Sequence, residues 1–211
     1  MPESMTYDSL VQDVEDYAER HDSTFLNQIP RFIMMAENRI ASECRGLGFV
    51  KFATGNLTQG DPKLAKPARW RETASLTITV SNQRVFLKER AYTYCRAYWP
   101  NEALTDVPVY YADYGYEHLL LAPTPNSAYA LELSYHERPE PLSAANQVSW
   151  TTQYAPQLLL FGALLEAQPF LKRPERVAEF QTLFDRAKAA VEQESAFRMN
   201  GDQALGRTGV Q

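Results

Sequence analysis

Residues 157–171, QLLLFGALLEAQPFL, decide the fold, because this stretch is apolar on almost every side. A helix of this composition must be surrounded by other elements instead of lying at a surface. Pro156 falls within its first turns and Thr151 or Thr152 can cap it, so the sequence predicts a buried helix that runs up to Pro169. One neighbouring helix cannot cover such a surface, so several parts of the chain must pack on it.

A last helix opens at Pro174 and carries a narrow apolar seam that ends at Glu194. Alternating steps of three and four residues separate the seam positions, which is typical of two antiparallel helices packed as a hairpin. The seam consists of Val177, Phe180, Phe184, Ala187 and Val191.

Two amphipathic helices are predicted near the N-terminus. Between residues 7 and 20 apolar side chains recur at helical spacing, with acidic residues elsewhere on the wheel. A second apolar stripe begins near Pro30 and stops at Gly46 and Gly48. These two helices most economically pack on the last two, which predicts an antiparallel helical bundle formed by both chain ends.

The middle of the chain has the period of two that is typical of strands. Residues 74–80, ASLTITV, alternate apolar and polar, and residues 81–83 then turn the chain into RVFLKE, which predicts a hairpin. Residues 90–99 fit a helix and a strand equally well, and the sequence leaves both open.

A second hairpin is predicted further along. Residues 118–122 form a short apolar run, residues 123–127 have turn chemistry, and residues 129–136 alternate between apolar and polar. The second strand is expected to place one face on a core and the other in solvent, and to end before Pro139 and Pro141.

These elements predict an α+β protein in which an antiparallel β domain is inserted into an antiparallel helical bundle formed by both chain ends. The last residues are small and polar, with three glycines, so we expect a flexible tail. The expected division is 1–48 for the first helices, 49–150 for the β domain, 151–198 for the helical hairpin and 199–211 for the tail.

Composition excludes several classes of protein. The 211 residues carry a net charge of −5. This charge argues against a protein that binds nucleic acid by neutralising phosphates, because such binding needs clustered Lys and Arg. No apolar run approaches the ~20 residues that cross a bilayer, and the first residues are acidic where an export signal would be basic, so we expect a soluble intracellular protein without membrane contact. Cys44 and Cys95 have no metal-ligand spacing, and we expect two buried thiols and no cofactor or metal.

One row of residues resembles a hydrolytic triad. Glu132, Ser134 and His136 project from the same side of a predicted strand. Positions two apart lie ~6 to 7 Å from each other, too far for a serine to be activated by a direct hydrogen bond. No GxSxG elbow is present, so we expect a solvated strand face and no enzyme, with a small Ser/His hydrolase as the weakest alternative.

Aromatic residues crowd the predicted β segment. Core filling and sheet pairing explain many tyrosines. A contact surface explains them as well, because Tyr and Trp are enriched at subunit interfaces. A glycan-binding module is a further alternative, because a carbohydrate-binding surface can have a similar composition.

Three segments resemble the head-to-tail adaptor proteins of short-tailed bacteriophages, the tail tubular protein A type of connector. They are FLNQIPRFIMMAENRI (25–40), YWPNEALTDVPVYYADYGYEHLLLAPTPNSAYALELSYHERPEPLS (98–143) and YAPQLLLFGALLEAQPFLKRPERVAEFQ (154–181). The resemblance implies a virion structural protein that forms a ring, typically dodecameric, between the portal protein and the tail nozzle protein. It implies that genomic DNA passes through the ring without sequence-specific binding, and that the ring assembles in the bacterial cytoplasm.

The resemblance also suggests contact residues. The C-terminal extension of such proteins reaches the portal, which implies contacts of Leu205, Arg207 and Val210 with the portal or a neighbouring subunit. The β part faces the tail, which implies contacts with another subunit or the nozzle for Tyr110, Tyr111, Tyr114, Pro123 and Pro125.

Overall fold

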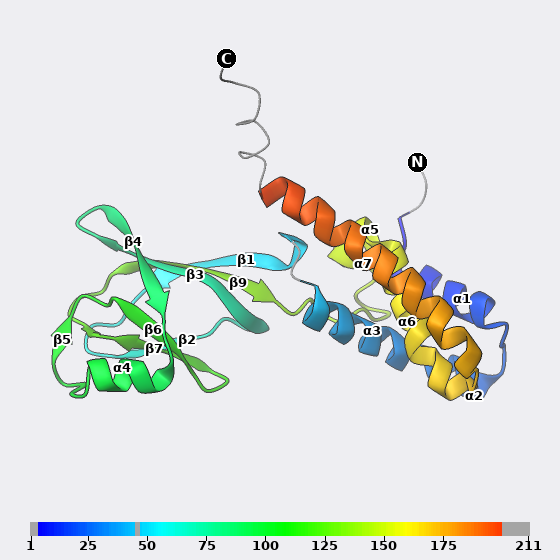
Figure 1. Ribbon diagram of the computed structural model, residues 1–211, viewed down its shortest axis with the longest axis horizontal. Coiled ribbons are helices and arrows are strands. Elements are labelled where there is room, and N and C mark those ends of the chain that lie inside the picture. Colours follow the sequence, from blue (N-terminus) through cyan, green and yellow to red (C-terminus); the bar gives the residue numbers. More distant parts are fainter. Residues whose placement is uncertain (1–3, 45–46, 200–211) are drawn as a thin grey trace, which may run out of the picture. The chain divides into compact units, whose positions relative to one another are not determined.

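The computed structural model describes residues 4–44 and 47–199 and shows a mixed α+β protein, as the sequence predicts. Within these residues the chain forms two compact units (Figure 1). The first, which we call the helical unit, contains the described residues up to Phe49 and from Arg138 onward. The second, which we call the β unit, is Val50–Glu137.

Elements from before and after the β unit make up the helical unit. They are α1 (Tyr7–Ala18), α2 (Ser23–Leu26), α3 (Ile29–Glu43), the 3-10 turn η1 (Leu47–Phe49), α5 (Trp150–Tyr154), α6 (Pro156–Leu171), the 3-10 turn η2 (Pro174–Arg176) and α7 (Val177–Met199).

Local sequence explains where α1 begins and ends. The Thr6 hydroxyl accepts a hydrogen bond from the Ser9 backbone N–H, and the Ser9 hydroxyl oxygen accepts one from Thr6 N–H, so a capping box satisfies two otherwise free donors. The helix stops at Glu19, whose backbone is left-handed at φ 52°. Leu10 and Val14 are buried, while the acidic residues lie outside this stripe, as the helical period predicts.

The start of the apolar helix differs from the prediction. Neither Thr151 nor Thr152 caps it, because Ala155 precedes α6 and makes no side-chain capping bond. Ser149 instead caps the short α5, where its hydroxyl accepts from Thr152 N–H in a capping box. Pro156 then begins α6 as a separate helix. The helix also passes through Pro169 and ends at Leu171, so the proline removes one hydrogen bond without stopping the helix.

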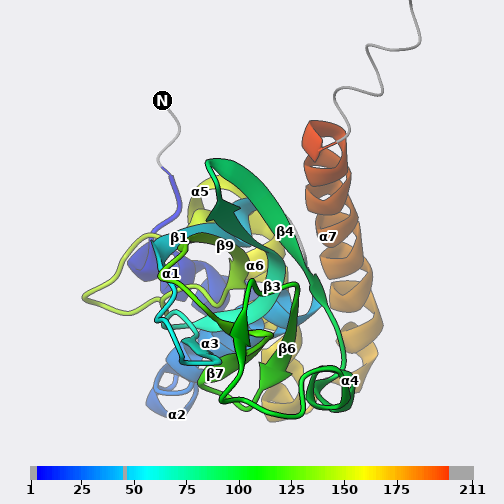
Figure 2. The ribbon, with the colours of Figure 1, turned by 90° about the vertical axis from the view of Figure 1, so that its left-hand side faces the viewer.

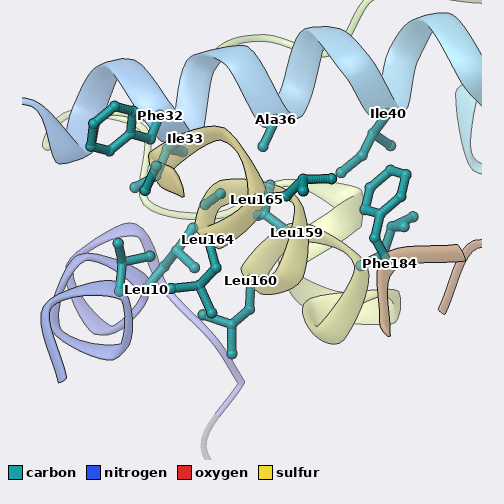
Figure 3. Packing of buried hydrophobic residues seen from close by; sticks show 14 of the residues in the cluster. Leu10, Phe32, Ile33, Ala36, Ile40, Leu159, Leu160, Leu164, Leu165 and Phe184 are labelled. Carbon is teal, nitrogen blue, oxygen red and sulfur yellow. The ribbon is translucent and has the colours of Figure 1, made fainter. Parts of the chain in front are cut away.

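The core of the helical unit is shared by helices far apart in sequence. Ile33, Ala36 and Ile40 of α3 face α6 near Leu159 and Leu165, whereas Leu160 and Leu164 lie on the side of α6 that is nearer to Leu10 of α1 (Figure 3). Phe32 of α3 and Phe184 of α7 belong to the same cluster. Each fully buried Leu, Ile or Phe contributes about 1.5–3 kcal/mol. The prediction that the QLLLFGALLEAQPFL stretch lies inside is confirmed, because nearly all of its apolar side chains are buried.

The β unit is built from short strands and one helix. They are β1 (Val50–Asn56), β2 (Lys63–Ala65), β3 (Trp70–Val80), β4 (Gln83–Glu89), α4 (Tyr92–Tyr98), β5 (Thr105–Asp106), β6 (Tyr110–Tyr114), β7 (His118–Ala122), β8 (Thr124–Pro125) and β9 (Ala130–Glu137). Among the described residues, seven strands form one sheet in the order β1-β9-β3-β4-β6-β7-β2, and β5 pairs with β8. The expectation of a purely antiparallel domain is wrong, because β4 with β6 and β5 with β8 are parallel pairs.

The first predicted hairpin is confirmed. β3 and β4 pair antiparallel, and the two residues between them, Ser81 and Asn82, both have positive φ angles of 50° and 64°. A two-residue turn of this kind matches the right-handed twist of the strands. The ambiguous stretch after β4 is helical, since α4 spans Tyr92–Tyr98.

The second predicted hairpin is wrong. β7 pairs with β6 and β2, whereas β9 lies between β1 and β3. The predicted turn, residues 123–127, contains the short strand β8, which pairs with β5 instead of closing a hairpin between β7 and β9. Alternation predicts that a segment is a strand, but it does not identify the strand's neighbours.

Candidate interaction surfaces

Aromatic and arginine side chains gather where α4 packs on β6. We call this set the tyrosine–arginine cluster; it consists of Tyr92, Tyr94, Tyr98, Tyr110, Tyr114, Arg90 and Arg96. Helical spacing places Tyr94 and Tyr98 on one side of α4, where their rings stack at 6.2 Å. The Tyr110 ring meets both of them edge-on, at 5.4 and 4.9 Å.

The arginines of the cluster lie against the rings. The Arg90 guanidinium carbon is 5.7 Å from the ring centres of both Tyr94 and Tyr110. Arg96 lies 5.3 Å from the ring centre of Tyr92, donates a hydrogen bond to its hydroxyl and forms an ion pair with Glu102. These contacts hold flexible side chains in defined positions, so less conformational entropy is lost when a partner binds.

The cluster is open to solvent. Tyr92, Tyr94 and Tyr98 are each 44% exposed. Beside them an open hollow of about 460 Å³ is lined by Glu89, Arg90, Ala91, Tyr92 and Asp113. A hydrogen bond with Tyr110 raises the pKa of Tyr94. Exposed Tyr and Arg in fixed positions are the side chains that dominate protein–protein contacts.

The predicted contact residues separate into two groups. Tyr110 and Tyr114 are half-buried members of the tyrosine–arginine cluster, and their role in subunit or nozzle contacts stays a prediction. Tyr111, Pro123 and Pro125 are buried within the β unit, which takes their side chains away from the surface in this conformation. Burial together with the neighbouring Glu89 raises the pKa of Tyr111 to about 12. The other three predicted contacts, Leu205, Arg207 and Val210, lie outside the described residues.

The exposure of two phenylalanines was not predicted from the sequence. Phe52 on β1 is 68% exposed and Phe86 on β4 is 63% exposed. The strand period could have predicted the exposure of Phe86. Val85 and Leu87 lie on the face of RVFLKE that is turned toward the core, so Phe86 lies on the opposite face.

The row that resembles a triad is not a solvated face throughout. Ser134 is buried on the central strand β9, between β1 and β3. Glu132 is engaged by Arg84, whose guanidinium nitrogen lies 3.3 Å from a carboxylate oxygen. This arrangement serves the sheet and brings no nucleophile to the surface.

The helical unit has its own exposed surface along α7. A hollow of about 330 Å³ lies between α7 and the start of α6, lined by Tyr154, Pro156, Ala187, Ala190 and Val191 among others. All charged residues of α1 are acidic, because its sequence YDSLVQDVEDYA holds four acidic residues and no basic one. Burial, and to a smaller extent the neighbouring Asp16, raises the pKa of Asp13.

Two features are absent from the part of the chain that the structure describes. No helix there is long and apolar enough to span a membrane. Within residues 4–44 and 47–199 no group of three or more His, Cys, Asp or Glu side chains is placed to hold a metal ion. The side chains of Cys44 and Cys95 are both buried, as the sequence predicts.

Comparison with known proteins agrees with the resemblance of the three segments. No curated protein matches the chain. The family model of the SU10 adaptor protein matches residues 5–207, which includes both the helical unit and the β unit. This is a family of phage head-tail adaptors, so the expectation of an adaptor is confirmed. The chain therefore belongs to the SU10 adaptor protein family.

Proposed function

We propose that this protein forms a ring of twelve copies that joins the portal protein to the tail nozzle protein. Genomic DNA passes through the centre of this ring. The observation that carries the proposal is the match of the adaptor family over residues 5–207, because it spans both units and leaves little of the chain for another function. On this proposal the ring assembles in the bacterial cytoplasm and has a structural role in the virion, without enzymatic activity.

The exposed side chains of the β unit support a role in protein contacts. The tyrosine–arginine cluster presents three tyrosines at 44% exposure on a short helix, held by stacking and by arginine contacts. Isolated domains rarely leave so many ordered aromatic side chains open unless another protein covers them. On this proposal Tyr110 and Tyr114, which belong to the cluster, contribute to the contact with a neighbouring subunit or the nozzle.

Charge supports the proposed passage of DNA. The chain has a net charge of −5, and α1 carries only acidic charges. A surface that does not neutralise phosphates releases few counterions, so a duplex gains little by staying bound to it. A channel lined in this way repels the backbone and lets DNA slide.

The finer division of the chain belongs to the same proposal. The helices on both sides of the β unit act as one antiparallel bundle, the β part is inserted between them, and residues 199–211 reach the portal through Leu205, Arg207 and Val210. The core shared by α3 and α6 supports the bundle, because it ties the two chain ends together.

The proposal is tested by mixing the purified protein with purified portal rings. Native mass measurement and negative-stain images should show a collar of regular copy number on one face of the portal. A protein that stays monomeric, both alone and with the portal, would contradict the proposed function.

A further inference from the structure

Among the described strands, β1 and β4 have long unpaired edges, whereas β2, at the other end of the sheet, spans only three residues. β1 pairs with β9 along all seven of its residues, and within the described residues no strand lies on its other side. β4 pairs with β3 through Gln83–Leu87 but meets β6 only at Lys88 and Glu89. In the described part of the chain the second edge of β4 is therefore open from residue 83 to residue 87. β4, which carries this edge, is the long green ribbon of Figure 2.

The direction of the unpaired backbone groups follows from two hydrogen bonds. The N–H of Leu57 donates to Tyr129 at 2.8 Å, and successive residues of a strand alternate between its two edges. The backbone groups of Phe52 and Thr54 therefore point to the free edge of β1. The N–H of Lys88 donates to Val109 at 3.0 Å on the β6 side, so the backbone groups of Arg84 and Phe86 point to the free edge of β4.

The two free edges are complementary in direction. β1, β9, β3 and β4 are successively antiparallel, so β1 and β4 run in opposite directions. If β1 of another copy is placed beside β4, the sheet continues as one antiparallel ladder. The side chains agree as well, because Thr54, Glu132, Thr77 and Phe86 form one row across the four strands and therefore lie on the same face.

We infer that β1 of one copy pairs with β4 of a second copy of this chain, in the register that sets Phe52 opposite Phe86 and Thr54 opposite Arg84. This register lets the outward backbone groups of each strand exchange hydrogen bonds in two closely spaced pairs. The contact joins two different edges, so it is head-to-tail and repeats from copy to copy, as a ring requires. The inference rests on the proposed ring and names the contact that builds it.

Side chains on the shared face favour a second copy as the occupant. Phe52 and Phe86 are the exposed aromatics of these two strands, and the register makes them a cross-strand pair, which stabilises a sheet. Charge is complementary too. Arg84 already reaches across one strand to its own Glu132, with an N to O distance of 3.3 Å. In the joined sheet Arg84 can also reach across one strand, β1 of the next copy, to Glu132 of that copy.

The register is tested by a disulfide between copies in the full chain. Within one molecule Phe52 and Phe86 stand three strand spacings apart, roughly 14 Å, whereas a disulfide needs Cα atoms about 4.4–6.8 Å apart. A Phe52→Cys/Phe86→Cys double variant can therefore link only different molecules. The matched control is Lys51→Cys/Phe86→Cys, because Lys51 projects from the opposite face of β1.

The two variants are oxidised after assembly and compared on non-reducing gels, with native mass measurement beside them. We expect the Phe52→Cys/Phe86→Cys protein to give a ladder of dimers, trimers and larger species that collapses on reduction, and the control to stay monomeric on the gel. A ring of regular mass without cross-links would overturn the inferred contact and leave the proposed ring intact. Cross-linked chains that never close would support the contact and contradict the ring. A protein that forms no assembly and no cross-links would contradict both.

Discussion

The Arg39 side chain donates through Nε to Glu166 Oε1 at 2.6 Å, which ties α3, before the β unit, to α6, after it. The pair is largely enclosed, with Glu166 12% and Arg39 32% exposed. Arg39 also lies over the Phe184 ring at 5.9 Å, so one guanidinium contacts three helices of the helical unit. An ion pair in this position opposes separation of the two chain ends.

Removal of one partner of this pair should destabilise the protein. In Glu166→Ala the Arg39 charge loses its nearest acceptor in a partly dry site and keeps only Glu43, 3.8 Å away, so we expect the free energy of unfolding to fall by about 1–3 kcal/mol. The control is Glu194→Ala on α7, whose ion pair with Arg198 is exposed at 59% and 65% and should be worth less than about 1 kcal/mol. Equal losses for both variants in urea unfolding would contradict this ranking.

The close approach of Gly48 to Trp150 predicts an intolerant position. A Cβ added at Gly48 would lie 2.0 Å from Cε2 of Trp150, so the indole must move. Gly48→Ala should lower the free energy of unfolding by about 1–3 kcal/mol, as overpacking generally does. Gly55→Ala is the matched control, since nothing lies within 4 Å of its added Cβ. Thermal unfolding followed by circular dichroism should give a clearly lower melting temperature for Gly48→Ala than for Gly55→Ala. The reverse order would contradict the close approach of Gly48 to Trp150.

The buried carboxyl of Glu37 predicts a pH dependence. Burial raises its pKa to about 7, although the Leu142 N–H, 3.2 Å from both oxygens, partly offsets the rise. The unfolded carboxyl ionises near pH 4.5, so the folded state binds more protons between these values and stability falls as the pH rises through them.

Glu37→Gln tests this dependence. The amide oxygen still accepts from Leu142, but no charge is buried. Relative to the wild type, the variant should therefore gain about 2 kcal/mol of stability between pH 5 and pH 8, after allowance for partial exposure. Unfolding midpoints in urea at the two pH values measure the gain. A difference between variant and wild type that does not change with pH would contradict the assignment.

The sequence predicts elements of this protein better than it predicts their neighbours. Helical spacing identified the stripe on α1 and the buried α6, and Ser81-Asn82 identified the β3–β4 turn, because each signal is local. The pairing of β9 was missed because its partners, β1 and β3, lie more than 50 residues earlier in the chain. Strand alternation carries no information about such distant partners.

The candidate contacts show the same limit. Residue type drew attention to the tyrosines around β6, and Tyr110 and Tyr114 are found in the tyrosine–arginine cluster, where their contact role stays a prediction. It did not distinguish them from Tyr111, which is 4% exposed, since neighbouring residues of a strand face opposite sides. Phe52 was missed because the free edge of β1 exists only once β9 has paired with its other side.

The role proposed for the last residues makes a separate prediction. Deletion of residues 199–211 should leave the free energy of unfolding within about 0.5 kcal/mol of the full chain, because the shared core of the helical unit is untouched. Attachment to the portal should be lost, since Leu205, Arg207 and Val210 are removed. Co-sedimentation of the truncated protein with portal rings measures this, and unchanged attachment would remove the proposed contact.

The most direct measurement of the central claim is a cryo-electron microscopy map of intact virions of the phage that encodes this chain. We predict that the helical unit and the β unit both fit, in regular copies, into a collar between the portal and the tail nozzle, around density for DNA. A map in which another protein fills that position, or in which this chain is absent from the junction, would contradict the account.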